Sequence, residues 1–449
     1  GLTVSHLRFG KKPIQSPYQI DAADFIACHN PSYVTRYDVV AGIKEGGIFL
    51  LNSPWTLAEM EHELPASMKN AIAKNHVKFY NMDGVKLARE VGMGNRINTV
   101  MQAAFFALAH VIPAEEAVGY MKAAAKKSYS KKGEAVVQKN YAAIDVGAKG
   151  FEEIKYPTSW ATTTEGAVVK DVTDDPYFQD FIKPVLAQKG DSLPVSKLSP
   201  DGTVPTGTTK YEKRGIAVDI PQWIPENCIQ CNQCAMVCPH ASIRPFLVKE
   251  GTEVPFVTKP AVGKEFAGYG FRIQVTPLDC TGCGNCADIC PAKEKALKMV
   301  PLHTQEAEIA NWEAAIKLPD PDVQFVANTV KNSQFRQPLF EFSGACAGCG
   351  ETPYIKLITQ LFGDRMIIAN ATGCTSIYGG SAPTVPYTVN SKGHGPAWAN
   401  SLFEDNAEFG FGLHLATKQR REKLAAVVSE LAAKLEDEGK AICQDWLDN

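Results

Sequence analysis

Two copies of one cysteine motif constrain this chain more than any other feature of its sequence. Residues 228–239 are CIQCNQCAMVCP and residues 280–291 are CTGCGNCADICP, so both segments follow the pattern C-x2-C-x2-C-x3-C-P. Three cysteines at this tight spacing suit one face of a cuboidal four-iron, four-sulfur cluster, while the fourth points away and binds the other cluster of a pair. Each motif alone is therefore incomplete, and the two must fold around each other.

The pattern predicts two crossed sets of ligands. The first cluster is expected to use Cys228, Cys231, Cys234 and Cys290, and the second Cys280, Cys283, Cys286 and Cys238. Pro239 and Pro291 keep each cysteine loop from running back into the preceding helix, which directs the fourth ligand outward. We therefore expect a ferredoxin-like domain with two 4Fe-4S clusters over residues 203–319. Between the motifs, residues 254–262 and 269–275 are expected to add strand or hairpin structure.

Zinc is the alternative occupant, because it also binds four thiolates. Zinc ribbons, however, pair two separate C-x2-C units, and that arrangement leaves the third and fourth cysteines of each motif unused. The spacing therefore favours iron and sulfur over zinc. Two such clusters in one small domain pass single electrons and do not usually act on a substrate. The sequence thus implies an electron source on one side of this domain and an electron carrier on the other.

Composition narrows the class of protein further. The chain of 449 residues is 45% hydrophobic and 21% charged, and its net charge of −3 gives no strong field for nucleic acid or an anionic membrane. We expect no membrane span and no export signal. The cysteines are clustered, which favours metal binding in a reducing, cytoplasmic compartment. The isolated Cys28 and Cys443 are expected to be small buried residues, and the lysines at 126–127 and 131–132 a solvated helix end.

Residues 1–160 alternate short apolar runs with helical patterns. Strands are expected at 2–10, 24–30, 46–55 and 77–83, and helices at 57–75 and 95–111. One face of the second helix carries Ile97, Val100, Met101, Ala104, Phe105 and Leu108. Alternation of strands and helices at this interval predicts a parallel, Rossmann-like α/β domain.

The rest of the chain divides by composition. Residues 161–202 are polar and rich in Pro, Gly and Thr, with one short helical pattern at 177–190, so we expect a linker there. From residue 320 to residue 449 a second α/β-like region is expected. A strand is predicted at 366–370 and a helix beginning near Pro353. The chain is therefore predicted to be an α/β multidomain protein.

A third group of cysteines lies in this last region. Cys346, Cys349 and Cys374 suit three of the four ligands of another cluster, which we expect to be the one nearest the electron source. They stand among Gly344, Gly348, Gly350 and Gly373, which let the backbone approach a bulky diphosphate closely. The alternative is a two-cysteine turn with a stray third cysteine, such as a labile zinc knuckle.

Another glycine-rich turn precedes the helix expected at 95–111. The segment VGMGNR could hold an anion on free backbone N–H groups, or could be no more than a helix entry. It is not a dinucleotide-binding fingerprint, because Ile97 occupies the position of the third glycine. The two interpretations of this turn stay open on the sequence alone.

Five segments together resemble the single-chain pyruvate:ferredoxin oxidoreductase family. They are SHLRFGKKPI, ENCIQCNQCAMVCPH, LDCTGCGNCADICP, FSGACAGCGETPY and IANATGCTSIYGGSAPTVPY, and the resemblance covers essentially all 449 residues. It implies oxidative decarboxylation of pyruvate on thiamine diphosphate with magnesium, and transfer of the acetyl group to coenzyme A. It also implies that electrons pass singly through three 4Fe-4S clusters to ferredoxin or flavodoxin, and that the protein is a homodimer.

The resemblance also implies roles for particular residues. Cys346, Cys349 and Cys374 correspond to ligands of the family's third cluster, and Glu351 and Cys374 to residues against the thiamine cofactor. Residues 320–449 correspond to the opening of the thiamine-diphosphate-binding domain. Asn98 and Asn140 match family positions that touch coenzyme A, which favours an anion site at the glycine-rich turn before Asn98.

The sequence also departs from the family pattern. The fourth cysteine of the third cluster and the GDG motif that binds magnesium and diphosphate are absent here, since GDR at 363–365 lacks the second glycine. We expect both to lie in sequence outside this chain, with the parts that bind pyruvate. Cys443 is an alternative fourth ligand, and His394 a loop residue without an assigned role. The alternative function is a non-catalytic, polyferredoxin-like electron-transfer subunit.

Overall fold

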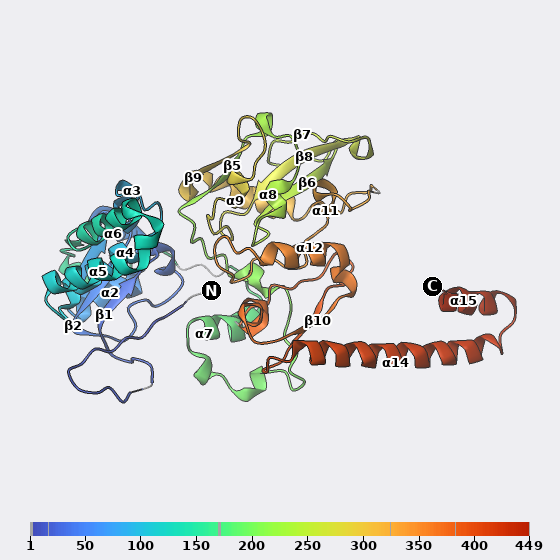
Figure 1. Cartoon of the computed structure of the whole chain (residues 1–449), viewed down its shortest axis with the longest axis horizontal. Helices are drawn as coiled ribbons and strands as arrows, with labels where there is room; N and C mark the ends of the chain where they lie inside the picture. The colour runs from blue at the N-terminus through green and yellow to red at the C-terminus, as the bar shows by residue number, and fades with distance from the viewer. Residues whose placement is uncertain (1–2, 17, 169–171, 324, 382, 449) are drawn as a thin grey trace. The chain divides into compact units, whose positions relative to one another are not determined.

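The computed structural model describes residues 3–16, 18–168, 172–323, 325–381 and 383–448 (Figure 1). The chain forms two compact units, the first made of Gly1–Val195 and Lys213–Val218 and the second of Ser196–Glu212 and Asp219–Asn449. Both contain helices and strands, so the protein is of the mixed α/β class. Each unit is described by itself below.

The first unit is built on a sheet of order β1-β2-β3-β4, in which β1, β2 and β3 are parallel and β4 pairs antiparallel with β3. The parallel pairing confirms the prediction from strand and helix alternation. Its elements are β1 (Ala23–Cys28), β2 (Ile43–Asn52), α1 (Leu57–Glu63), α2 (Ala66–Lys74), β3 (Lys78–Met82), α3 (Gly84–Glu90), α4 (Asn98–Ala109), α5 (Ala114–Tyr129), α6 (Glu134–Gly147), β4 (Glu152–Glu153) and α7 (Lys183–Leu186).

Helices cover both faces of this sheet. Alternate residues of β2 point to opposite sides, so Phe49 packs in a core with residues of α1 and α2, and Leu50 in a second core with α3, α4 and α6. Strands buried on both faces are typical of parallel sheets. The apolar face predicted for α4 is confirmed, because Val100, Met101 and Ala104 are all buried in the second core.

Two predictions for the first unit were wrong. The expected strand at 2–10 is not formed over its described residues, 3–10. Arg8 instead donates hydrogen bonds to carbonyls of its own loop, including that of Gln19 at 2.8 Å. The helix expected at 57–75 is broken into α1 and α2, because Pro65 lies between them in an extended conformation, as the N-cap of α2.

Other local predictions are confirmed. The helical pattern at 177–190 forms a π-helical turn, Phe178–Ile182, that continues into α7. Part of the expected linker, residues 169–171, lies outside the described residues. Lys126 and Lys127 lie in the last turn of α5 and are exposed. Cys28 is buried, and burial raises the pKa of its thiol to about 11.

The second unit carries all the cysteine motifs. It has the antiparallel pair β5-β9, the antiparallel sheet β6-β8-β7 and the parallel pair β10-β11. Its elements are β5 (Asp219–Trp223), α8 (Gln233–Met236), β6 (Ile243–Lys249), β7 (Lys259–Pro260), β8 (Tyr269–Val275), α9 (Asn285–Asp288), β9 (Leu297–Pro301), α10 (Ala307–Ala315), α11 (Val330–Ser333), α12 (Thr352–Phe362), β10 (Ile367–Asn370), α13 (Cys374–Ser376), β11 (Ala397–Asn400), α14 (Asn406–Ala432) and α15 (Asp437–Asp448).

These elements confirm the strands expected between the two motifs and at 366–370, and the helix expected near Pro353. The long helix α14 lies largely exposed along its length and packs against α15 (Figure 1). Within the described part of the chain, no helix combines the length and apolar character that crossing a membrane requires.

Candidate functional site

Strand pairing brings the two cysteine motifs together end to end. Trp223, shortly before the first motif, pairs with Leu297, shortly after the second. Ile243, shortly after the first motif, pairs with Val275, shortly before the second. Because both pairings are antiparallel, the last cysteine of each motif is carried to the first cysteine of the other. The fold therefore favours the crossed sets of ligands that the spacing predicts.

Electrostatic interactions link the thiols of the two motifs. Cys234 interacts electrostatically with Cys228, Cys231 and Cys290, which are the other members of its predicted set. Cys286 interacts with Cys238, Cys280 and Cys283, the members of the second set, and also with Cys234 of the first. These interactions place Cys238 and Cys290 each among the cysteines of the opposite motif.

Burial sets the protonation of these thiols. It is the largest cause that raises the pKa of Cys234 and Cys286 far above that of an ordinary thiol, and the neighbouring cysteines raise it further. Burial likewise raises the pKa of Cys280 to about 12, against the opposing effect of a backbone hydrogen bond at Gly282. Thiolates so buried require cations, and iron supplies them when a cluster forms.

The two motifs have matching loop geometry. Gln230 and Gly282 occupy equivalent positions and have φ of 60° and 69°, and Asn232 and Gly284 follow with φ of 58° and 83°. These left-handed turns lie between the first cysteine of each motif and the start of α8 or α9, the short helices that carry the third cysteines, Cys234 and Cys286. At two of these positions the second motif uses glycine, which adopts such a conformation without strain.

Backbone N–H groups point at several of the sulfur atoms. Ser242 donates to Cys238 Sγ, Gly282 to Cys280 Sγ and Ala296 to Cys290 Sγ, each at 3.4 Å. Hydrogen bonds of this type stabilise negative charge on cluster ligands and help to set reduction potentials. These N–H groups are therefore compatible with cysteines that act as cluster ligands.

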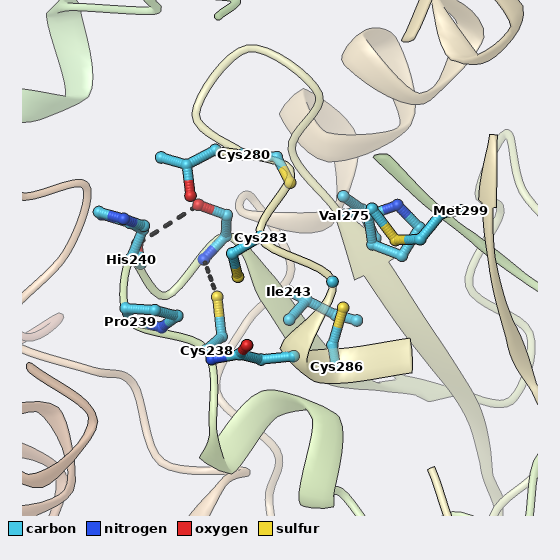
Figure 2. A pocket seen from close by; sticks show the side chains of 14 residues that line it. Cys238, Pro239, His240, Ile243, Val275, Cys280, Cys283, Cys286 and Met299 are labelled. Carbon is cyan, nitrogen blue, oxygen red and sulfur yellow. Dashed lines mark hydrogen bonds between the residues drawn. The ribbon is translucent and has the colours of Figure 1, made fainter. Parts of the chain in front are cut away.

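A cavity lies among the thiols of the second group. Figure 2 shows Cys238, Cys280, Cys283 and Cys286 around it, with Ile243, Val275 and Met299 also lining it. No group of three His, Cys, Asp or Glu residues in the described ranges is arranged to hold a single metal ion. A cuboidal cluster distributes its ligands over different iron atoms, so its thiolates need not converge on one point. The residues present fit such a cluster.

Lysines bind the carbonyl groups of several residues in these motifs. Lys259 Nζ donates to Cys228 O at 3.0 Å, and Lys295 Nζ donates to Cys290 O at 2.7 Å. Both lysines therefore place positive charge beside the first set of ligands. The buried Lys356, from α12, donates to the carbonyls of Ala235 and Met236 in α8.

The loop with the third group of cysteines contacts the second set. A backbone hydrogen bond from Gly348 reaches Cys283, and a Cβ placed on Gly348 would lie 3.6 Å from Cys283 Cβ. The loop itself closes through a hydrogen bond from Cys349 N to Cys346 O of 3.0 Å. The third group is therefore adjacent to the second set of ligands rather than isolated from it.

Cys374 approaches the same loop through the residues that follow it. Tyr378, one turn beyond Cys374, donates a hydrogen bond of 2.7 Å to Glu351 Oε2. Burial and then Glu351 raise the pKa of Tyr378 well above its usual value, so Tyr378 stays a neutral donor. The thiols of Cys346 and Cys374 are exposed, and that of Cys349 is half-buried.

The first unit holds the two asparagines singled out by sequence. Asn98 is the exposed first residue of α4, whereas Asn140 is buried and donates to Val136 O of its own helix at 2.8 Å. The turn before Asn98 lies against α6, since a Cβ on Gly92 would be 3.3 Å from Lys139 Cε. The structure thus adds a lysine to the glycine-rich turn and helix start.

Some residues of this site were not found from the sequence. Lys259, Lys295 and Tyr378 carry no local signal, because their partners are distant in the chain. Lys356 does have a local signal, because it is the single charged residue in the helix TPYIKLITQLF. His394 lies in an exposed loop. Cys443 was expected to be buried, but it is only half-buried in the surface helix α15. No described contact places either residue at these groups.

Family models match three parts of the chain. Residues 1–150 match a model described as pyruvate ferredoxin/flavodoxin oxidoreductase, and residues 227–294 a 4Fe-4S dicluster domain. Residues 164–217 match a domain of unknown function. The dicluster match covers all eight cysteines of the two motifs.

Curated relatives align with the chain from end to end. A pyruvate:ferredoxin oxidoreductase of Moorella thermoacetica is 62% identical, and the alignment covers 100% of this chain and 39% of that protein. A pyruvate-flavodoxin oxidoreductase of Klebsiella pneumoniae is 51% identical, with the same coverage of 100% and 39%. A pyruvate dehydrogenase [NADP(+)] of Cryptosporidium parvum is 49% identical, over 96% of this chain and 24% of that protein. The chain therefore spans well under half the length of these relatives.

Proposed function

Because this chain corresponds over its whole length to one region of the pyruvate:ferredoxin and pyruvate-flavodoxin oxidoreductases, we propose that it serves the same reaction. The reaction is oxidative decarboxylation of pyruvate with coenzyme A to acetyl-CoA and CO2, with ferredoxin or flavodoxin as the electron acceptor. The crossed grouping of the eight thiols is the observation that carries this proposal, because it fits a two-cluster electron relay.

In this proposal the eight thiolates hold two 4Fe-4S clusters, which take up and release single electrons when bound. Cys346, Cys349 and Cys374 hold a third. The contact of Gly348 with Cys283 joins the third group to the second set, and the interaction of Cys286 with Cys234 joins the second set to the first. The order of the relay is therefore third group, second set, first set, and then the acceptor protein.

The glycine-rich region around Glu351 is proposed as part of a thiamine diphosphate site, within the opening of the domain that binds this cofactor. Thiamine diphosphate, when bound, acts as the electron sink that lets a 2-oxo acid lose CO2. A Cβ on Gly350 or Gly373 would meet nothing within 4 Å, so both positions leave room for a bulky group. Tyr378 fixes the Glu351 carboxylate by hydrogen bonding. Magnesium belongs to this proposal by resemblance to the family.

The first unit is proposed to be Rossmann-like and to contact coenzyme A. The supporting features are the exposed Asn98, the glycine-rich turn before it and Lys139, which together offer N–H donors and a cation to an anionic ligand. Asn140 belongs to this proposal by resemblance to the family, since its side chain is buried and bonded to its own helix. A homodimer remains part of the proposal by resemblance to the family.

The experiment is an anaerobic assay of the intact holoprotein with a low-potential electron acceptor. The proposal predicts reduction of the acceptor that requires both pyruvate and coenzyme A, and that yields CO2. Omission of either substrate is the control. Acceptor reduction that does not depend on pyruvate would instead favour the non-catalytic, polyferredoxin-like relay. So would a protein that contains its clusters but does not reduce the acceptor when pyruvate is added.

A further inference from the structure

A buried lysine lies between the two proposed cluster sites without a carboxylate partner. Lys356 comes from α12, which begins directly after Glu351, and its side chain is buried. Its ammonium group donates to Ala235 O, and to Met236 O at 3.2 Å, at the C-terminal end of α8. These carbonyls stand between Cys234, assigned to the first set, and Cys238, assigned to the second.

The face of α12 that is buried with Lys356 is polar. Thr352, Thr359 and Gln360 are buried, while Tyr354 and Ile358 on the other side of the helix are exposed. A helix normally buries its apolar stripe, because burial of polar groups is costly unless each finds a partner. The sequence of α12 therefore delivers a cation into the interior, at a position where an aliphatic residue would be the ordinary choice.

Charge balance at this position differs from that at Lys69, the other lysine that is buried among the described residues. Lys69 in the first unit is also buried, and it pairs with the Glu61 carboxylate at 3.4 Å. Among the described residues, no ion pair involves Lys356. The nearby Arg244 is itself a cation, and an ion pair with Glu341 already balances its charge.

The anions that face Lys356 are the cysteine thiolates. Burial is the largest cause that lowers the pKa of Lys356, to about 8, and Arg244 lowers it further. The interactions with Cys238 and Cys234 raise it. Both of its described hydrogen bonds are donated to carbonyl oxygens, as an ammonium group donates. An uncompensated buried charge is strongly destabilising, so the site requires a permanent negative charge close by. Clusters held by four thiolates supply it.

We propose that the Lys356 ammonium is the buried counter-ion shared by both clusters of the dicluster domain, and that it raises the reduction potential of each. The inference rests on the proposed iron–sulfur function. Reduction adds a negative charge to a cluster, and a fixed cation nearby stabilises the reduced form more than the oxidised form. A buried cation acts more strongly than an exposed one, because solvent does not screen it.

Lys295 provides a matched control. Its ammonium also donates to two carbonyls beside a cluster ligand, Asp288 O at 2.9 Å and Cys290 O at 2.7 Å, but its side chain is exposed. Lys356→Met and Lys295→Met therefore remove the same charge and the same type of hydrogen bond. They differ in burial, which is the property that the proposal invokes.

The test is a redox titration, followed by electron paramagnetic resonance, of the anaerobically purified intact holoprotein. Lys356→Met should lower both dicluster midpoint potentials by at least the equivalent of a tenfold change in the one-electron equilibrium, about 59 mV. Lys295→Met should cause a smaller shift, and Lys356→Arg, which keeps the charge, should stay nearer the wild type. Unchanged potentials in Lys356→Met, or shifts no larger than those of Lys295→Met, would overturn the proposal.

Cluster content separates this inference from the proposed function. If the wild-type protein binds no iron and acid-labile sulfide, the relay itself is wrong. If Lys356→Met fails to retain clusters, Lys356→Gln and Lys356→Arg decide the question. Loss of clusters in the neutral Gln variant with retention in the Arg variant supports a required charge. Equal loss in both variants, or retention in the Gln variant with unchanged potentials, contradicts the counter-ion role.

Discussion

Single hydrogen bonds link the segments that form the third site. Tyr378 and Glu351 come from different elements, and their bond of 2.7 Å ties the start of α12 to the turn that follows Cys374. Tyr378 is buried and packs edge-on against Phe340, so that a phenylalanine could keep the ring contacts and lose only the hydroxyl.

Tyr378→Phe should therefore destabilise the protein through the lost bond alone. A hydrogen bond to a charged group contributes about 1.5–3 kcal/mol, so the free energy of unfolding should fall by about that amount. Urea unfolding followed by circular dichroism measures it. Tyr354→Phe, at a side chain that is 69% exposed on α12, is the matched control and should change little. Equal stability of the two variants would show that the Tyr378 bond contributes nothing.

At the residue scale, the sequence specified the cysteines well and their neighbours poorly. The spacing within each motif already implied that Cys238 and Cys290 leave their own motif for the other. Lys259 and Lys295 could not be predicted, because each bonds carbonyls that only the folded chain brings within reach. Ligand spacing is a local property, whereas the positive charges around the ligands depend on tertiary contacts.

Packing of whole elements in the first unit depends on close approach of two helices. A Cβ on Gly147, at the end of α6, would lie 2.3 Å from the carbonyl oxygen of Val100 in α4. Only glycine permits this contact without displacement of one helix. Gly119, within α5, has nothing within 4 Å of the same hypothetical atom.

Gly147→Ala and Gly119→Ala should therefore have opposite effects. The first forces two backbones apart and should destabilise the fold by about 1–3 kcal/mol, as overpacking does. The second restricts only the unfolded chain at a helical position and should stabilise by about 0.4–1 kcal/mol. Thermal unfolding of both variants measures the difference. If Gly147→Ala were neutral, α4 and α6 would not be packed as closely as described.

Helices and strands were predicted correctly where their apolar residues recur on the face that the fold buries. The strands β1, β2 and β3 and the apolar face of α4 were predicted, because their patterns match the faces that they bury. The strand expected at 2–10 is not formed over the described residues 3–10, where Arg8 closes a loop by donating to backbone carbonyls instead. The burial of the polar face of α12 was not predicted either, because the partners of these polar side chains lie far away in the sequence.

On the scale of the whole molecule, the proposed electron relay depends on how the two motifs share their cysteines. The registers of β5 with β9 and of β6 with β8 join the motifs at both ends, and the thiols group accordingly. The chain spans 39% of the length of its pyruvate:ferredoxin oxidoreductase relative from Moorella thermoacetica, and the catalytic activity remains a proposal. The crossed relay, by contrast, can be tested on this region directly.

The most direct measurement compares the iron content of two double variants of the intact, anaerobically purified protein. If the sets are crossed, Cys238→Ser with Cys283→Ser damages one cluster, and Cys238→Ser with Cys234→Ser damages both. The first variant should then retain about four more iron atoms per chain than the second. If each motif held its own cluster with its own four cysteines, the order would be reversed, and that result would contradict the account.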